Sequence, residues 1–242
     1  MAALLPDLRV ERKIDLVIAN GENAAGGIGL TPSTADEFFK SGVDLITSGN
    51  HIWHHREIIP RLDEDQRILR PLNLPPGVPG RGYLITDRVM VINLLGRVFM
   101  GNYDCPFRTV DHLFEEVTDR PNVIIVDFHA EATAEKVALG WYLDGRVSAV
   151  VGTHTHIGTV DVRVLPRGTA YVSDIGMVGA ADSVIGDDID SVLDRFLTMM
   201  PHRLAVGKGN SIFNSVLVEV EDDSGKALSI DRVDLEFSVN ES

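Results

Sequence analysis

The sequence predicts an α/β fold in which a layered sheet carries helices on both faces. Short β-branched apolar runs recur along the chain, and amphipathic stretches with helix-capping signals lie between several of them. The runs are apolar at nearly every position, which is typical of strands buried on both faces. The predicted strands span residues 14–19, 43–47, 89–95, 123–128, 147–151 and 170–175.

Three helices are predicted from their start and stop signals. The first begins at the pair Thr31 and Pro32, which reads as an N-cap followed by an N1 proline, and it closes at Gly42. The other two helices are predicted over residues 133–144 and 187–200.

The remaining chain is predicted to form a loop and a hairpin. Residues 69–83 contain four prolines and are expected to be irregular. Residues 211–237 alternate in polarity and predict two antiparallel strands around a turn at 222–225. No linker, repeat or low-complexity tract interrupts the chain, so we expect a single domain over residues 1–242.

Charge and cysteine content narrow the functional classes. The net charge is −14, from 22 basic and 36 acidic residues, and such a surface repels duplex nucleic acid and anionic membranes. Cys105 is the single cysteine, so no intrachain disulfide can form and a reducing cytoplasm is expected. No apolar run is long enough to span a membrane, and the first residues do not form a signal peptide. The sequence is compatible with a homo-oligomer.

Polar residues follow four of the predicted strands. Ligands of open α/β sheets bind outside the carboxyl ends of the strands, so these side chains are expected at one rim. The candidates are Glu22, Asn23, Asn50, His51, His129, His154 and His156.

These candidates offer only oxygen and nitrogen donors, a set that suits Fe, Mn or Zn. A carboxylate can bridge two cations, and Glu22 is the carboxylate in the set. His154 and His156 are two residues apart, so in extended backbone they are expected to project to the same side. The sequence therefore predicts a site for a pair of metal ions.

Each candidate alone also has an ordinary structural explanation, and the metal interpretation depends on all of them together. Other polar positions are given lesser roles. His54 and His55 are interpreted as surface or substrate-side residues, and His112, at an expected helix start, and His202 as structural. The glycine-rich segment 26–29 is a weak phosphate-loop signal, interpreted as backbone that passes close to the rim.

The motifs at these positions resemble a known family. GEN at residues 21–23, GNH at 49–51 and GTHTH at 152–156 resemble the calcineurin-like metallophosphoesterases. Longer strings resemble the bacterial 2′,3′-cyclic-nucleotide 2′-phosphodiesterase branch of that superfamily, over most of the chain. These strings are ANGENAAGG, GNHIW, DFHAEATAEK, VGTHTH, GTAYVSDIGM and DSVIG.

The resemblance implies an αββα sandwich and two divalent metal ions, with iron foremost and manganese or zinc as alternatives. Carried over to this chain, Glu22 resembles the carboxylate that bridges the ions, and His51 resembles the proton donor beside them. Asn23 and His156 resemble ligands of the first metal, and Asn50, His129 and His154 resemble ligands of the second.

One departure from the family pattern concerns the first strand. The family begins with a strand that carries a Gly-Asp motif, whose Asp is a ligand of the first metal. Here residues 1–6 resemble the helix that follows this strand, and Asp7 and Asp15 are poor substitutes. We therefore expect a weakened first metal site, and an apolar slot or poorly paired edges beside the strand predicted at 14–19. We expect this form to be less stable and less active than one extended with that strand.

The expected function is hydrolysis of a small cyclic nucleotide. A hydroxide that bridges the metals would attack the phosphorus, and His51 would protonate the leaving ribose oxygen. Two alternatives stay open at this point. One is a degenerate homologue that is weakly active, or non-catalytic and regulatory through metal binding. The other is a hydrolase of another phosphate ester, since a fold does not fix a substrate.

Overall fold

The computed structural model describes residues 1–238, and its centre is a six-stranded mixed sheet. Four of its strands run parallel, with β4, β5, β6 and β8 as neighbours, and antiparallel strands close both edges. In spatial order the strands are β3 (Tyr83–Ile85), β4 (Val89–Leu95), β5 (Val123–His129), β6 (Ala149–Thr153), β8 (Ala170–Val172) and β7 (Arg163–Val164).

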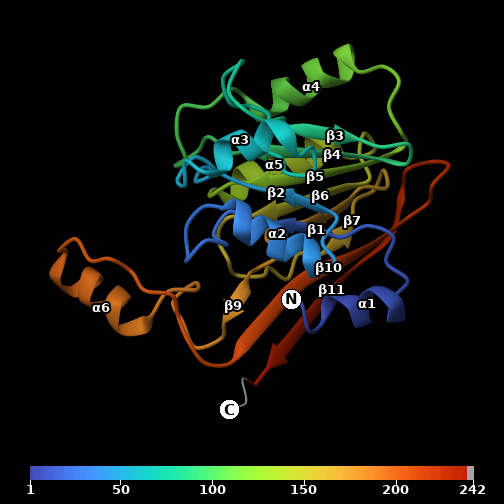
Figure 1. Cartoon of the computed structure of the whole chain (residues 1–242). Coiled ribbons are helices and arrows are strands. Elements are labelled where there is room, and N and C mark those ends of the chain that lie inside the picture. Colours follow the sequence, from blue (N-terminus) through green and yellow to red (C-terminus); the bar gives the residue numbers. More distant parts are fainter. Residues whose placement is uncertain (239–242) are drawn as a thin grey trace.

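A second layer of strands packs on one face of this sheet. It contains the parallel pair β1 (Ile18–Asn20) and β2 (Leu45–Thr47). It also contains β9 (Val178–Ala180) and a long antiparallel hairpin of β10 (Ser211–Val220) and β11 (Ala227–Phe237). The hairpin lies across the face of the central sheet (Figure 1).

Helices cover the outer faces of both layers. On the central sheet lie α4 (Pro106–Glu116) and α5 (Thr133–Leu143), which share one apolar core with β3 to β6. On the other layer lie α1 (Leu5–Glu11), α2 (Pro32–Lys40) and α3 (Ile58–Glu64). The predicted αββα arrangement, with helices on both faces, is therefore confirmed.

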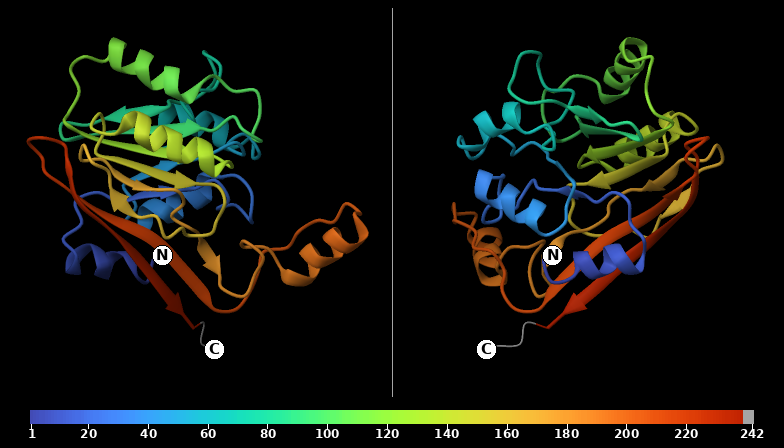
Figure 2. Two further views of the ribbon diagram at one scale, coloured as in Figure 1. Left: turned by 180° about the vertical axis from the view of Figure 1, so that it is seen from behind. Right: turned by 45° about the vertical axis from the view of Figure 1, so that its right-hand side comes forward.

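The last helix stands apart from these layers. Helix α6 (Ile189–Thr198) lies away from the body at the end of a long connection (Figure 2). Phe196 and Leu197 on this helix are 75% and 81% exposed. Among residues 1–238, no helix is both long and apolar enough to cross a membrane.

The predicted strands and helices agree with the structure to within two residues at each end, apart from three corrections. The strand predicted at 14–19 is shorter and later, because the amide of Val17 donates to the Asp44 side chain and not to a neighbouring strand. The strand predicted at 170–175 ends at Val172. His112 lies in the middle of α4 and not at a helix start, because Pro106 begins the helix at N1.

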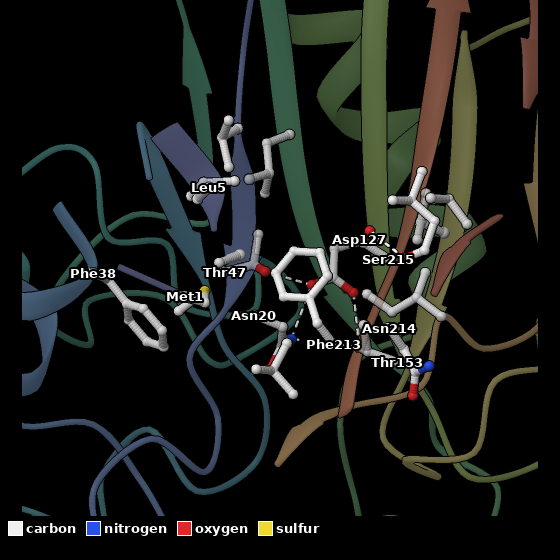
Figure 3. A pocket seen from close by; sticks show the side chains of 18 of the residues that line it. Met1, Leu5, Asn20, Phe38, Thr47, Asp127, Thr153, Phe213, Asn214 and Ser215 are labelled. Carbon is white, nitrogen blue, oxygen red and sulfur yellow. Dashed lines mark hydrogen bonds between the residues drawn. The ribbon is translucent and has the colours of Figure 1, made fainter. Parts of the chain in front are cut away.

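The expected slot beside β1 is present. Within the described residues β1 pairs only with β2, and β1 also lines a cavity of about 1800 Å³ that extends to Glu22 and His129. Figure 3 shows residues of both layers around this slot, among them Asn20, Asp127 and Phe213.

A close approach between β6 and β8 gives a test of this packing. A Cβ placed on Gly152 would lie 1.7 Å from the carbonyl oxygen of Ser173, so Gly152→Ala must push two strands apart. We expect it to lower the free energy of unfolding by about 3 kcal/mol. Gly179→Ala is the control, since a Cβ there meets its nearest neighbour at 3.6 Å, and it should cost less than about 1 kcal/mol. Urea denaturation of both variants measures this, and equal losses would contradict it.

Candidate metal centre

Strand ends from the two layers meet at one rim of the molecule. Glu22 and Asn23 follow β1, the turn at Gly49 follows β2, and His129 ends β5. The connection between the layers is direct, because the Asn20 side chain donates to Asp127 Oδ2 over 2.9 Å. The predicted gathering of these polar residues at one rim is therefore observed.

Glu22 lies at the centre of this rim. Its side chain is buried and accepts hydrogen bonds from the backbone amides of Gly49 and His51, the latter over 2.6 Å. Its Oε1 atom is 3.2 Å from His51 Nδ1 and 3.6 Å from His129 Nε2. The hydrogen bond to Glu22 raises the pKa of His51, against the opposing effect of burial.

Gly49 is necessary for this packing. A Cβ at this position would lie 2.3 Å from His129 Nε2 and 2.7 Å from the carboxyl carbon of Glu22. Any larger residue would therefore displace both side chains. With glycine at this position, the Glu22 carboxylate and the His129 imidazole can both lie against the backbone of residue 49.

His129 is held as a neutral imidazole with a defined tautomer. Burial lowers its pKa well below the usual value. Its Nδ1 atom lies 3.0 Å from the hydroxyl of Thr153, which donates to Asp127 over 2.8 Å. Because the single hydroxyl proton goes to Asp127, His129 donates from Nδ1 and its Nε2 lone pair faces the rim. That is the form in which a histidine binds a metal.

The remaining candidates form two contact pairs. His154 Nδ1 is 3.0 Å from His129 Nε2, and its Nε2 is 2.9 Å from a carboxylate oxygen of Glu131. His156 Nε2 is 3.0 Å from the amide of Asn23. The Oδ1 atom of Asn50 is buried and has no hydrogen-bond partner among the described residues.

The ligand set itself stays a prediction. Within residues 1–238, no group of three or more His, Cys, Asp or Glu side chains is arranged to hold a metal ion. The chemistry of the site nevertheless fits divalent cations. It offers a buried carboxylate, a neutral imidazole whose Nε2 faces the rim, and the unpartnered amide oxygen of Asn50.

The loop that carries His154 and His156 is not extended, which corrects the prediction of a shared side. Strand β6 ends at Thr153, and both histidines have left-handed backbone, with φ values of 103° and 66°. The alternation of a strand therefore does not apply, and each imidazole meets a different neighbour. Such backbone costs free energy in a non-glycine residue and must be held by surrounding contacts.

A buried ion pair supplies that support. Asp174, after β8, accepts hydrogen bonds from the amide and the hydroxyl of Thr155, over 3.0 and 2.7 Å. Lys136 of α5 donates to the same carboxylate over 2.8 Å, and both charged side chains are almost fully buried. The pair therefore fixes Thr155, the residue between the two histidines.

Asp174, Lys136 and Asp127 belong to the surroundings of the site but were not predicted from the sequence. The available signal was an acidic or basic residue within an apolar segment, since such a residue is rarely buried without a partner. Tyr103 was also missed, although burial and the negative charge of Glu22 raise its pKa. His54 is exposed, as expected.

The support of the histidine loop can be tested by stability measurements. Lys136→Met leaves Asp174 buried without its cation, so we expect a loss of about 3–5 kcal/mol in the free energy of unfolding. The double variant Lys136→Met, Asp174→Asn should lose less than Lys136→Met alone, because no unpaired charge is left. The exposed pair of Arg88 and Asp222, 3.1 Å apart, is the control, and Arg88→Met should cost at most about 1 kcal/mol. Strictly additive losses in the double variant would show that the pair does not act as a unit.

The chain matches one protein family along nearly its whole length. Residues 1–233 match the family described as YmdB-like protein. A 2′,3′-cyclic-nucleotide 2′-phosphodiesterase of Bacillus subtilis (strain 168) is 45% identical over 233 residues, which are 95% of this chain and 88% of that protein.

Two crystal structures have the same fold. One is of a Thermus thermophilus protein described only as hypothetical, with 42% identity and a TM-score of 0.91, covering 98% of this chain and 92% of that one. The other is described as a novel phosphatase from Mycoplasma pneumoniae. It shows 31% identity and a TM-score of 0.92, covering 98% of this chain and 88% of that one.

Proposed function

Because the chain belongs to the YmdB-like protein family, we propose that it is a cytoplasmic, metal-dependent phosphodiesterase that hydrolyses small 2′,3′-cyclic nucleotides. The observation that carries this proposal is the position of Glu22, buried between His51 and His129 at the meeting point of the two strand layers. The substrate class is inferred from the name of the Bacillus subtilis relative.

The proposed ligands divide into two sets that correspond to the observed contacts. Asn23 and His156, which touch each other, would hold one ion, and His129 and His154, which also touch, would hold the second. Asn50 would complete the second set with its unpartnered buried oxygen. Glu22 would be a ligand of both ions. Iron is the first choice because the motifs resemble those of the metallophosphoesterases, and the oxygen and nitrogen donors also suit manganese or zinc.

The two cations would supply Lewis acidity at the phosphate oxygens. The protein's own contribution is to fix the donors before substrate arrives. The backbone amides of Gly49 and His51 hold the Glu22 carboxylate, and Thr153 sets the tautomer of His129. The donors therefore need little reorganisation when a phosphate binds.

His51 would provide the proton for the leaving group. Its side chain is 38% exposed, so a substrate can reach the ring, and its Nδ1 lies against Glu22, which favours the protonated form. When the ribose oxygen leaves the phosphorus, it would take a ring proton from protonated His51, and His51 would become neutral. The acidic surface of the protein favours a small phosphorylated substrate over duplex nucleic acid.

Hydrolysis of a phosphate monoester is a second candidate, since one structural relative is described as a phosphatase. The same donors would bind a terminal phosphate. Comparing nucleoside 2′,3′-cyclic phosphates with the corresponding monophosphates in one assay distinguishes the two candidates.

The metal assignment predicts the effect of a substitution at Glu22. Glu22→Gln keeps the shape of the side chain but removes the charge, so the metal content of the purified protein should fall by at least half and hydrolysis by about 100-fold or more. The control is Glu64→Gln, on the exposed surface of α3, which should retain both. Elemental analysis and an assay with 2′,3′-cyclic AMP measure these effects. An unchanged metal content in Glu22→Gln would exclude Glu22 as a shared ligand.

The role of His51 predicts a dependence on the leaving group. His51→Ala should slow hydrolysis of a 2′,3′-cyclic nucleotide by about 10²–10⁴-fold, while the metal content stays close to that of the wild type. A nitrophenyl phosphodiester needs little protonation of its leaving oxygen and should lose much less activity. His54→Ala is the control and should hydrolyse both substrates at wild-type rates. Equal losses on the two substrates would contradict the proton-donor role.

A further inference from the structure

The loop between β4 and α4, residues 96–105, leaves the central sheet beside the candidate metal ligands. The amide of Gly96, the first residue after β4, donates to the carbonyl of His129 over 2.9 Å. Within β4, the side chain of Asn93 donates over 2.7 Å to the first carbonyl after β2, where the turn to His51 begins. The start of the β4–α4 loop is therefore adjacent to the backbone segments that carry both of these histidines.

Two buried side chains hold the ends of the β4–α4 loop. Near its start, Glu135 accepts a hydrogen bond from the amide of Val98 over 3.1 Å. Near its end, Asn73 donates to the carbonyl of Asp104 over 2.9 Å. Hydrogen bonds to buried side chains fix the backbone groups that they join. Residues 99–103 are therefore held in a defined position at the rim, although they lie outside the core.

Phe99 exposes an aromatic ring within this held segment. The residue is 88% exposed, and its backbone is left-handed, with a φ of 64°. A single exposed apolar residue is common on protein surfaces, but this backbone is rare for a bulky residue and costs free energy. Residues that keep such a backbone are concentrated at binding and catalytic sites. Phe99 is therefore a candidate for direct contact with a ligand.

Tyr103 lies in the same loop, on the side of Glu22. Burial and the negative charge of Glu22 raise the pKa of Tyr103, so its phenol stays protonated and can donate a hydrogen bond. The ring is fixed by the backbone beside it, since a Cβ on Gly101 would lie 3.0 Å from a ring carbon. Unlike the hydroxyls of Tyr142 and Tyr171, the hydroxyl of Tyr103 bonds to no other side chain or backbone group in the described part of the chain. A donor at the metal rim is therefore free for a ligand.

We propose that the β4–α4 loop is the nucleoside subsite of the metal centre, where Phe99 stacks on the nucleobase and Tyr103 donates to a phosphate oxygen. The assignment rests on the proposed function, because it takes the phosphate to lie beside Glu22. Every base has a π-face, so a stacking ring accepts any base and favours the larger ring of a purine only modestly. The subsite therefore selects nucleotides over phosphate esters that carry no base.

The proposal predicts that losses depend on whether the substrate has a base. Phe99→Ala should raise KM for 2′,3′-cyclic AMP about tenfold and leave kcat within about twofold. The same variant should hydrolyse ribose 2,3-cyclic phosphate, which has no base, with unchanged kcat/KM. Alanine suits the left-handed backbone no better than phenylalanine does, so a disturbed loop would affect both substrates alike. Phe196→Ala, at a position that is 75% exposed on α6, is the matched control and should change neither.

Tyr103→Phe tests the second contact, because it keeps the ring and removes only the hydroxyl. Both substrates carry the phosphate, so kcat/KM should fall about tenfold for each. An equal rate to the wild type on both substrates would exclude Tyr103 as a donor to the phosphate.

A binding measurement on Phe99→Trp needs no turnover. Adenosine 3′-monophosphate should quench the fluorescence of the added tryptophan when the base stacks on it, and ribose 5-phosphate should not. The unaltered protein, with Trp53 and Trp141, is the reference that corrects for absorption by adenine.

Several results would overturn the stacking assignment. One is an equal loss in Phe99→Ala on the nucleotide and on the base-free substrate. Another is the same quenching in Phe99→Trp and in the unaltered protein. Unchanged kinetics of Phe99→Ala together with a smaller particle in gel filtration would assign the ring to a contact between protein chains. If the unaltered protein hydrolyses no cyclic nucleotide, the proposed function fails, and the fluorescence measurement still decides whether the loop binds a base.

Discussion

The buried carboxylate of Asp127 is the contact on which the rest of the rim depends. It lies on β5 and accepts hydrogen bonds from Asn20 on β1, Thr47 on β2 and Thr153 on β6, so one side chain joins strands of both layers (Figure 3). Burial raises the pKa of Asp127, and these three donors oppose that shift. Removing any donor would leave part of a buried carboxyl group unsatisfied, which is why the layers must meet in one register.

Two of these donors, Asn20 and Thr153, also hold the proposed metal ligands in position. The Oδ1 atom of Asn20 accepts from the amide of Glu22 over 3.0 Å, so the residue that bonds Asp127 also orients the start of the Glu22 turn. Thr153 accepts from His129 and thereby determines which ring nitrogen faces the rim. The positions of the candidate site residues therefore follow from the contact between the two strand layers. The geometry of the site depends on sheet packing as much as on the site residues themselves.

The sequence identified the elements whose signals are local, and it missed those that depend on distant partners. Strand β4 was predicted with its observed bounds, because a short run that is apolar at every position except Asn93 favours a buried strand over other states. The start of β1 was misplaced because the bond that decides it comes from Asp44, which is 27 residues away from Val17. The pairing of Lys136 with Asp174 joins positions 38 residues apart and leaves no periodic pattern. The common rim of the polar residues after the strands could be predicted because the carboxyl ends of parallel strands lie at one edge of a sheet by topology alone.

The left-handed backbone of His154 and His156 changes how substitutions at these positions should be interpreted. An alanine variant would remove the imidazole and also place an unsuited residue at φ values of 103° and 66°, so lost donor chemistry and a disturbed loop would look alike. Asparagine tolerates this backbone better than most residues and still offers a donor atom, an amide oxygen in place of a ring nitrogen. Glycine tolerates it without offering any donor. Because both replacements tolerate the backbone, the difference between them reports the contribution of a donor atom, without the disturbance of the loop that alanine would add.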